Sequence, residues 1–346
     1  MENNFSKKSI NEPIFFKSNR VRRIYTGGKL FSSFFGDSSA DGYFPEEWVC
    51  SSTKALNEGS TDPKEGVSLT ESGDYFDDLL ENQKEQLIGD RDELGILVKI
   101  LDSSIRLPIQ AHPDVPFSQA HFNSNHGKAE SWVILETRED ACIYFGFKEE
   151  ISKEDFDKAL LGGEKAFLPL LRRIPVNPGD VFFIPAKAVH AIGAGCLLLE
   201  TQEPTDFTIQ PEEKCGDYTL SENEMYIGLS REDALECFDM TIAGEKAEKA
   251  SRRTPKIIDG VQHLITEEDT PFFSVNRYFL DNSASAPLTG PAVYVITEGE
   301  GELYYDAYHR FLKKGDYFFM PYSANGRFKL RSEKKMQAIV CLPPKK

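Results

Sequence analysis

A nine-residue internal repeat constrains the fold of this chain more than any other feature of its sequence. Residues 177–185 (NPGDVFFIP) match residues 313–321 (KKGDYFFMP): a Gly-Asp turn, a run of aromatic and aliphatic residues, and a closing proline. Apolar runs bounded by turn residues are typical of β-strands. Two related β-modules predict two jelly-roll barrels, and a length of 346 residues also suits two domains.

We therefore expect a mainly β fold with two jelly-roll barrels and small helical insertions. The 25 Phe and 13 Tyr favour a β-rich core. Apolar residues at helical spacing predict the insertions near 76–88 and 152–172. Residues 1–240 are expected to form the larger barrel with these insertions, residues 241–254 an exposed polar linker, and residues 255–346 a smaller barrel.

The charge and composition exclude several classes of protein. The apolar fraction of 40% is too high for a disordered chain, and the net charge of −16 argues against binding to nucleic acid or to an anionic membrane. No apolar run approaches the roughly 20 residues of a membrane helix, and the N-terminal segment MENNF lacks the apolar core of a signal peptide. The six scattered cysteines are typical of a reducing compartment, so we expect a cytoplasmic protein.

Histidine is scarce, with six residues in the chain, so its placement is informative. Gln110 and His112 follow a strand at a spacing that puts both on one face, Glu130 begins a strand, and His190 closes the first repeat copy. Two imidazoles, a carboxylate and an amide suit a borderline divalent ion. Zinc is the first choice, with iron, manganese and cobalt left open. The counterpart of His190 in the second copy is Gly326, so the smaller barrel is expected to lack the metal.

These motifs resemble a known family, the zinc-dependent mannose-6-phosphate isomerases (class I phosphomannose isomerases), which have a cupin-type fold. The segments that carry the resemblance are Gln110–Asp114, Gly127–Glu130, Pro185–Ile192, Ile24–Leu30, Glu47-Trp48 and Thr205–Thr208. The resemblance implies two cupin-like barrels and an enzyme of carbohydrate metabolism. That enzyme interconverts mannose 6-phosphate and fructose 6-phosphate through a cis-enediol, with one zinc ion per chain.

The resemblance also implies roles for individual residues. The ion would be held by Gln110, His112, Glu130 and His190. Lys128 shares the strand face of Glu130 and would contact the phosphosugar substrate or move a proton. Asp206 would act as a base or bind a substrate hydroxyl.

Two positions depart from the family pattern. Gln210 stands where the family has an active-site arginine, so the charge that offsets an enediolate or a phosphate is missing there. Pro108 stands where the family often has serine. Arg106 is therefore expected to contact substrate in compensation, with Arg172 and Arg173 as further candidates.

Two other interpretations compete with an active isomerase. The loss of the family arginine favours a metal-bearing but attenuated protein that binds phosphosugars or regulates a partner. A different cupin enzyme, such as an iron oxygenase, would favour an open triad of histidines and a carboxylate, and the added Gln110 and the Lys128-x-Glu130 pair argue against it. The sequence does not indicate an oligomeric state.

Overall fold

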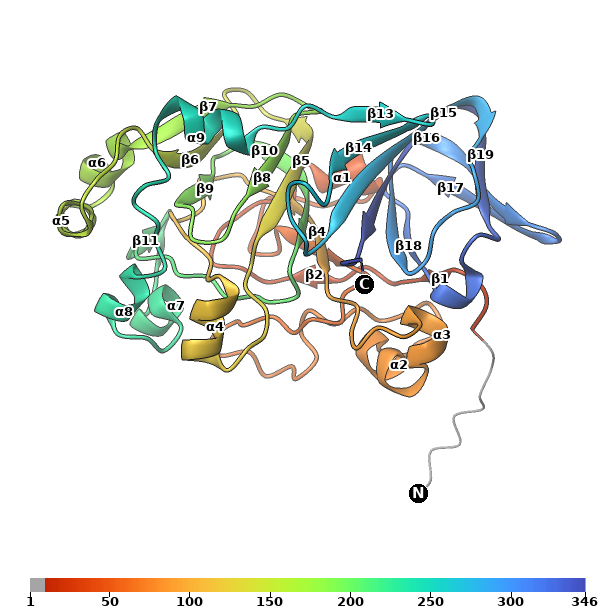
Figure 1. The fold of residues 1–346 in the computed structure, drawn as a ribbon, viewed down its shortest axis with the longest axis horizontal. Coiled ribbons are helices and arrows are strands. Elements are labelled where there is room, and N and C mark those ends of the chain that lie inside the picture. Colours follow the sequence, from red (N-terminus) through yellow and green to blue (C-terminus); the bar gives the residue numbers. More distant parts are fainter. Residues whose placement is uncertain (1–9, 346) are drawn as a thin grey trace, which may run out of the picture.

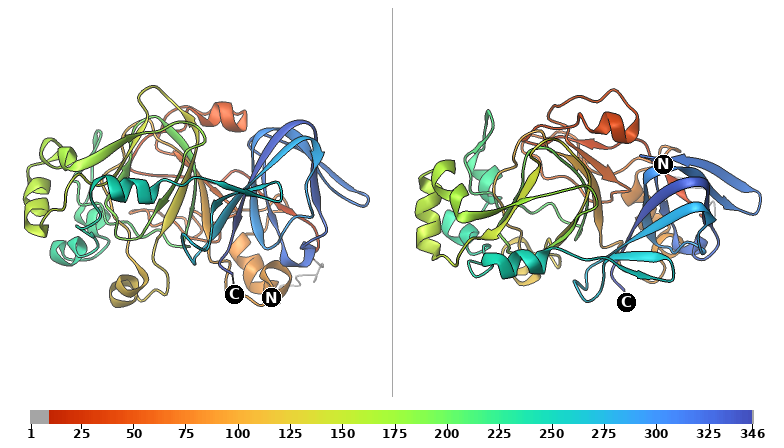
Figure 2. Two further views of the ribbon diagram at one scale, coloured as in Figure 1. Left: turned by 45° about the horizontal axis from the view of Figure 1, so that its top comes forward. Right: turned by 90° about the horizontal axis from the view of Figure 1, so that it is seen from above.

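The computed structural model describes residues 10–345. The protein is mainly β, and two bodies of antiparallel strands lie side by side, with short helices around them (Figures 1 and 2). The prediction of a mainly β, cupin-like chain with two barrels and small helical insertions is confirmed. The outermost limits of the expected domains, residues 1–9 and 346, lie outside the described residues.

The N-terminal body is built around a six-stranded and a three-stranded sheet. The order in the first is β2 (Arg20–Val21), β3 (Glu46–Val49), β4 (Leu97–Asp102), β10 (Cys196–Gln202), β5 (Glu130–Thr137) and β8 (Val181–Ile184). The order in the second is β7 (Leu171–Pro175), β6 (Cys142–Phe147) and β9 (His190–Ile192), and a two-stranded ribbon pairs β11 (Lys214–Cys215) with β12 (Tyr218–Thr219).

Both faces of the six-stranded sheet are buried, which explains the unbroken apolar run in β10. Successive side chains of a strand point to opposite faces. Leu198 packs inside the N-terminal body with Trp132 and Ile143. Leu197 and Leu199 face the other way, into a core shared with the C-terminal body. Hydrophobic burial on both sides of this sheet therefore joins the two bodies.

The C-terminal body is an eight-stranded antiparallel sheet. Its order is β1 (Ile14–Phe15), β18 (Tyr317–Met320), β16 (Ala292–Tyr305), β19 (Lys329–Leu342), β15 (Ser274–Ala284), β14 (Val261–Ile265) and β13 (Lys256–Ile258), and β17 (Tyr308–Lys313) pairs with β16. Strand β1 shows that the start of the described chain adds a strand to this body rather than to the N-terminal one.

The two repeat copies have the same local structure. In each, a glycine with positive φ, Gly179 at 96° and Gly315 at 91°, forms the turn that leads into the strand. In each, the aspartate side chain accepts a hydrogen bond from the backbone three residues earlier, at 3.0 Å for Asp180 and 2.9 Å for Asp316. The repeat therefore marks equivalent strands, β8 and β18, in the two bodies.

The helices are short and lie in the connections between strands. They are α1 (Phe31–Phe35), α2 (Phe76–Asn82), α3 (Lys84–Ile88), α4 (Val115–Phe122), α5 (Lys153–Leu161), α6 (Glu164–Phe167), α7 (Glu222–Tyr226), α8 (Arg231–Leu235) and α9 (Gly244–Ser251), with 3-10 turns η1 (Leu168–Leu170) and η2 (Tyr322–Ala324). Among the described residues, no helix has the length and apolar character needed to cross a lipid bilayer. Helices α2, α3, α5 and α6 occupy the two segments where the sequence predicted helical insertions.

The polar segment 241–254 contains a helix that the sequence analysis did not anticipate. Helix α9 packs on β6 and β8, and its Glu248 forms an ion pair with Arg172. Its last residue, Ser251, is buried and donates a hydrogen bond to Phe183 O at 3.0 Å. The charged residues that suggested an exposed linker lie on the outer side of an amphipathic helix. The division into residues 1–240, a linker of residues 241–254 and residues 255–346 remains a prediction.

Candidate metal centre and active site

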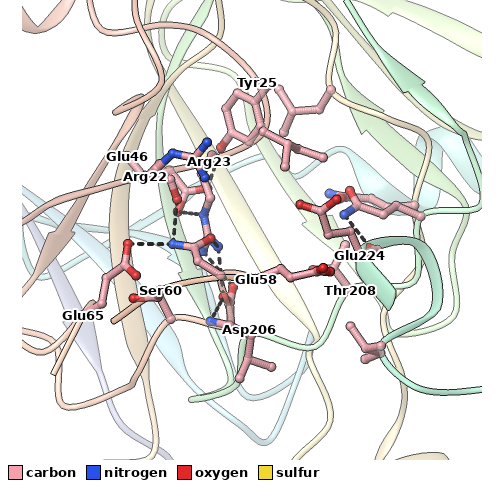
Figure 3. Close-up of a pocket in the computed structure, with 18 of the residues that line it drawn as sticks. Arg22, Arg23, Tyr25, Glu46, Glu58, Ser60, Glu65, Asp206, Thr208 and Glu224 are labelled. Atoms are coloured by element: carbon pink, nitrogen blue, oxygen red, sulfur yellow. Dashed lines mark hydrogen bonds and ion pairs between the residues drawn. The ribbon is translucent and has the colours of Figure 1, made fainter. Parts of the chain in front are cut away.

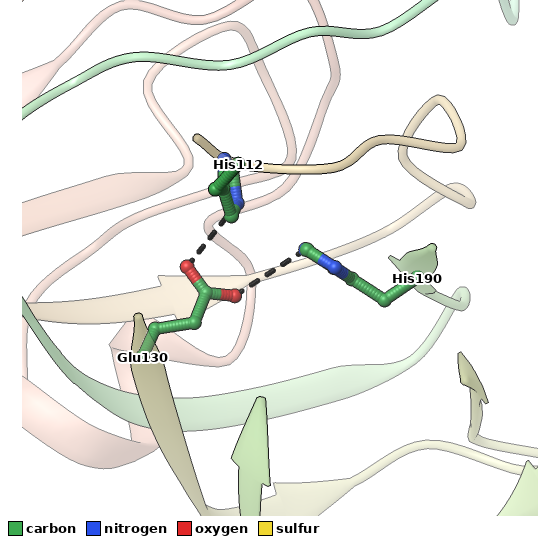
Figure 4. A group of neighbouring side chains, drawn as sticks. All are labelled: His112, Glu130 and His190. Atoms are coloured by element: carbon green, nitrogen blue, oxygen red, sulfur yellow. Dashed lines mark ion pairs between the residues drawn. The ribbon is translucent and has the colours of Figure 1, made fainter. Parts of the chain in front are cut away.

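The one group of three or more metal-type ligands among residues 10–345 is formed by His112, Glu130 and His190. Their ligand atoms lie within 4.8 Å of one another, and all three side chains are buried. Glu130 Oε2 lies 3.3 Å from His112 Nε2, and Glu130 Oε1 lies 3.4 Å from His190 Nε2. Figure 4 shows the carboxylate pointing between the two imidazoles.

Backbone pairing brings these residues together from distant parts of the chain. Glu130 begins β5, where it lies opposite Gln202 of β10 and Ile184 of β8. His190 begins β9, and its backbone exchanges two hydrogen bonds of 2.9 Å with Gln110. That bridge also places the Gln110 side chain beside the cluster, with Nε2 at 3.2 Å from His190 Nε2. The structure therefore brings all four predicted ligands together.

The histidines present their Nε2 atoms to the cluster. His112 Nδ1 lies 2.9 Å from Phe207 O, and His190 Nδ1 lies 2.9 Å from Ala188 O. A carbonyl oxygen can only accept a hydrogen bond, so each Nδ1 carries the proton and each Nε2 bears a lone pair instead. Burial lowers the pKa of both imidazoles, and burial with the nearby charge of Lys128 brings that of His112 to about 3. Both rings are neutral at pH 7, as metal ligands must be.

The donor set fits a divalent cation. Neither oxygen of Glu130 accepts a hydrogen bond from any described residue, although both are buried. Burial acts to raise the pKa of Glu130, but the charge of Lys128 lowers it well below its usual range. The Lys128 ammonium, 3.3 Å from Glu130 Oε2, is the one cation that pairs with this buried carboxylate among the described residues. Nitrogen and oxygen donors of this kind suit zinc and related ions.

A cavity of about 590 Å³ lies beside the metal-type cluster, and Figure 3 shows part of its lining. Gln110 and Lys128 line this cavity and contact the imidazoles of the cluster, whereas His112, Glu130 and His190 are not part of the lining. Lys128 Nζ lies 2.8 Å from His112 Nε2 and 3.3 Å from Glu130 Oε2. The remaining wall includes residues 22–25, the loop 54–65 and residues 206–227, together with the side chains of Glu46, Lys99 and Glu200.

Asp206 lines the same cavity, but it is tightly held. Arg23 donates to both of its oxygens, at 2.8 and 3.0 Å, and Leu56 N donates at 2.8 Å. Figure 3 shows Arg23 between Asp206 and Glu46. Although burial raises the pKa of Asp206, the Arg23 guanidinium lowers it below its ordinary value. A carboxylate with these partners is a weak proton acceptor, which favours hydroxyl binding over a role as base.

A further carboxylate that lines the cavity, Glu200 in the middle of β10, was not predicted from the sequence. It lies across the sheet from Lys99 of β4, whose Nζ is 3.1 Å from Glu200 Oε1. Trp132 Nε1 donates to Glu200 Oε2 at 3.1 Å, and the Trp132 ring packs edge-on against His190. Burial and the nearby charge of Glu130 raise the pKa of Glu200. One carboxylate within a buried, otherwise uncharged strand was the signal that could have revealed it.

The cations that were expected to replace the family arginine are engaged elsewhere. Arg106 forms a two-pronged ion pair with Glu212, at 2.8 and 2.5 Å, and it is not among the residues that line the cavity. Arg172 pairs with Glu248 and Arg173 donates to Asp140 O. Gln210 does line the cavity, and its Nε2 donates to Glu224 O at 3.0 Å.

Two other cations, Arg22 and Lys54, line the cavity and are exposed to solvent. Neither forms an ion pair within residues 10–345. The other cations of the lining, Arg23, Lys99 and Lys128, each pair with a carboxylate. Arg22 and Lys54 are therefore the cations of this cavity with charge available to a ligand.

Comparisons with known proteins agree with this arrangement. The chain is 32% identical over 329 residues to mannose-6-phosphate isomerase ManA of Bacillus subtilis, covering 92% of this chain and 96% of the relative. It is 28% identical over 319 residues to mannose-6-phosphate isomerase of Streptococcus mutans, covering 90% and 92%. No family model matches the chain.

Solved structures give the same result. The crystal structure of mannose 6-phosphate isomerase from Bacillus subtilis aligns with a TM-score of 0.75 at 25% identity, over 95% of this chain and 99% of that one. The apo form of the enzyme from Salmonella typhimurium, at 15% identity, shares the fold with a TM-score of 0.72 over 96% and 99%. The chain belongs to the mannose-6-phosphate isomerase family.

Proposed function

We propose that this protein interconverts mannose 6-phosphate and fructose 6-phosphate by moving a proton between C1 and C2 through a cis-enediol. The observation that carries the proposal is the buried cluster of His112, Glu130 and His190, with Gln110 beside it, next to a cavity large enough for a phosphosugar. Membership of the isomerase family supports it.

The six free, buried cysteines also support our proposal that the protein works in the cytoplasm.

We propose zinc as the metal, one ion per chain, held by Gln110, His112, Glu130 and His190. Two neutral imidazoles with oxygen donors are a usual zinc environment, whereas magnesium is usually bound by carboxylates, phosphates and water. When bound, the ion would polarise the oxygens at C1 and C2 of the substrate. This would favour removal of the carbon-bound proton that moves between C1 and C2.

Side chains of this protein would handle the proton and the developing charge. Glu200 is the proposed proton acceptor, because a carboxylate with a raised pKa is better matched to proton transfer near neutral pH than one held ionised. The Lys128 ammonium would donate a hydrogen bond to the oxygen on which negative charge develops. Asp206 and Arg23 would bind substrate hydroxyls through the polar atoms they turn to the cavity.

The direct test is a coupled assay of the purified protein with mannose 6-phosphate, following the appearance of fructose 6-phosphate. We expect turnover on the order of the 1–10³ s⁻¹ that is typical of enzymes. Tight binding of mannose 6-phosphate without conversion would instead identify an attenuated phosphosugar-binding protein. An absence of both binding and conversion would contradict the proposal.

Arg22 and Lys54 are the proposed contacts for the phosphate group. The double variant Arg22→Ala/Lys54→Ala is expected to raise KM for mannose 6-phosphate by about 10-fold or more, because a hydrogen bond to a charged group contributes about 1.5–3 kcal/mol. Steady-state kinetics with mannose 6-phosphate and with free mannose measure the effect. Lys29→Ala, a change at an exposed lysine outside the cavity lining, is the control. An equal loss with both sugars would show that these residues do not contact phosphate.

Gln210→Arg is expected to raise turnover by about 10-fold or more, if Gln210 faces the reacting carbons. A guanidinium there would stabilise developing negative charge, and one such donor can contribute on the order of 10²–10³ in rate. Gln210→Leu, which removes the hydrogen bond to Glu224 O without adding charge, serves as the control. Unchanged kcat and KM in the arginine variant would place Gln210 away from the chemistry.

A further inference from the structure

The segment that carries Lys128 is held along both of its backbone edges. Gly127 N donates to Glu203 Oε2 and Ala129 N donates to Glu203 Oε1, each at 3.0 Å. Lys128 N points the opposite way and donates to Pro113 O at 2.9 Å. In an extended segment, alternate N–H groups point to opposite edges and the side chains stand perpendicular to them. Fixing both edges therefore fixes the direction in which the Lys128 side chain leaves the backbone.

Further contacts lock the same segment. Glu203 N donates to Ala129 O at 3.1 Å, and Thr205 Oγ1 donates to Gly127 O at 2.8 Å. A Cβ atom at Gly127 would lie 2.6 Å from Pro113 O, so only glycine permits this close approach. These contacts and the Glu203 carboxylate together restrain the backbone on both sides of Lys128.

The Glu203 carboxylate is buried, and its hydrogen-bond partners are backbone N–H groups rather than a charged side chain. The residue is 1% exposed and forms no ion pair with any residue in the described part of the chain. A carboxylate in such a place costs free energy that a neutral side chain would not. Its two oxygens match two parallel N–H donors, whereas a glutamine side chain offers one acceptor oxygen and an NH₂ group that would face the second N–H.

The far end of the Lys128 side chain shows why this orientation matters. Lys128 is 4% exposed, and its Nζ lies within 3.3 Å of both His112 Nε2 and Glu130 Oε2. Because the Lys128 side chain is long, a small tilt of its backbone displaces Nζ by a larger distance. Misplacing a catalytic group by about 1 Å can cost on the order of 100-fold in rate.

We propose that Glu203 is a positioning residue: its carboxylate clamps the backbone on either side of Lys128 and so aims the ammonium group at the reacting oxygens. The catalytic part of this inference depends on the proposed isomerase function, whereas the clamp itself does not. Glu203 touches neither the cavity nor the metal-type cluster, so its effect on turnover passes through Lys128.

Glu203→Gln is expected to lower kcat for mannose 6-phosphate by about 10- to 100-fold, with KM changed by less than about 2-fold and metal content unchanged. Asp102→Asn is the control at another buried carboxylate. Asp102 Oδ2 accepts two backbone N–H groups, from Gly28 at 2.8 Å and Leu30 at 2.9 Å, and pairs with Arg138 at 2.7 Å, but Asp102 lies outside the cavity lining. The control is expected to lower thermal stability while leaving kcat within about 2-fold of the parent protein.

A double-mutant cycle separates positioning from general structural support. In a Lys128→Ala background, Glu203→Gln is expected to cause no further loss of kcat, because the group that it aims is gone. A loss of equal size in both backgrounds would overturn the proposal and assign Glu203 to the stability of the fold. An unchanged kcat in the single variant would overturn it as well.

Crystal structures of the parent protein and Glu203→Gln test the clamp without relying on activity. We expect Lys128 Nζ to shift by about 1 Å or more in the variant while Glu130 stays in place. An unmoved Nζ would overturn the clamp. An inactive parent protein together with a shifted Nζ would mean that the proposed isomerase function fails and the clamp stands.

Discussion

Replacing His112 or His190 with alanine is expected to remove the bound metal and to lower isomerase turnover by about 10³-fold or more. Each imidazole supplies a neutral lone pair to one small cluster, and a metal ion contributes several kcal/mol of charge stabilisation to reactions of this type. The fold should survive, because the surrounding core consists of apolar residues from three sheets rather than of the metal ligands.

Elemental analysis of each purified variant, with circular dichroism as a check of folding, measures this outcome. His263→Ala is the control, because His263 lies in β14 of the C-terminal body, away from the cluster. Full metal retention in a folded His112→Ala or His190→Ala protein would show that the ion is bound elsewhere.

Glu200→Gln is expected to lower kcat by about 10²- to 10⁴-fold, the usual contribution of a general base, while metal binding persists. The pH dependence of kcat provides an independent test of Glu200 as the base. Burial and the charge of Glu130 raise the pKa of Glu200, so its ionised form is lost on acidification at a higher pH than for an ordinary glutamate. The kcat of the parent protein should therefore decrease at low pH as Glu200 becomes protonated. The residual kcat of the Glu200→Gln variant should not show this decrease.

Glu47→Gln provides the matched control for Glu200. Glu47 is also a buried carboxylate in the six-stranded sheet, but it accepts hydrogen bonds from Ser18 and Tyr317 and does not line the cavity. Its variant is expected to keep the kcat and the pH profile of the parent protein. If Glu200→Gln retained more than about half of the parent kcat, another group would have to be the base.

The sequence was most informative where chemistry depends on local spacing. The Gly-Asp repeat identified equivalent strands, because a turn that needs positive φ at glycine is encoded within a few residues. Two of the four candidate ligands, Glu130 and His190, were expected near strand ends, and β5 and β9 begin at these residues. Gln110 and His112 were expected to share a face, and the structure pairs Gln110 with His190 through an isolated bridge outside the named strands. These expectations required no knowledge of which strands are neighbours.

The remainder of the site depends on pairing between strands that are distant in sequence. Lys99 and Glu200 meet because β4 lies beside β10, and Arg23 meets Asp206 across 183 residues of chain. Alternation within one strand does not reveal which residue lies opposite. Arg106 was expected to contact substrate because of its charge. It instead forms an ion pair with Glu212, a partner that the sequence did not indicate. The fate of a charged side chain is set by its partner.

The central claim, that this chain is a metal-dependent isomerase of mannose 6-phosphate, is tested most directly by titrating metal into chelated protein while measuring the conversion of mannose 6-phosphate to fructose 6-phosphate. The account predicts that chelated protein is inactive and that activity returns linearly until one zinc ion is bound per chain. It also predicts that His190→Ala protein recovers no activity over the same range. Full activity in the metal-free chain, or none in the chain with one zinc ion bound, would contradict it.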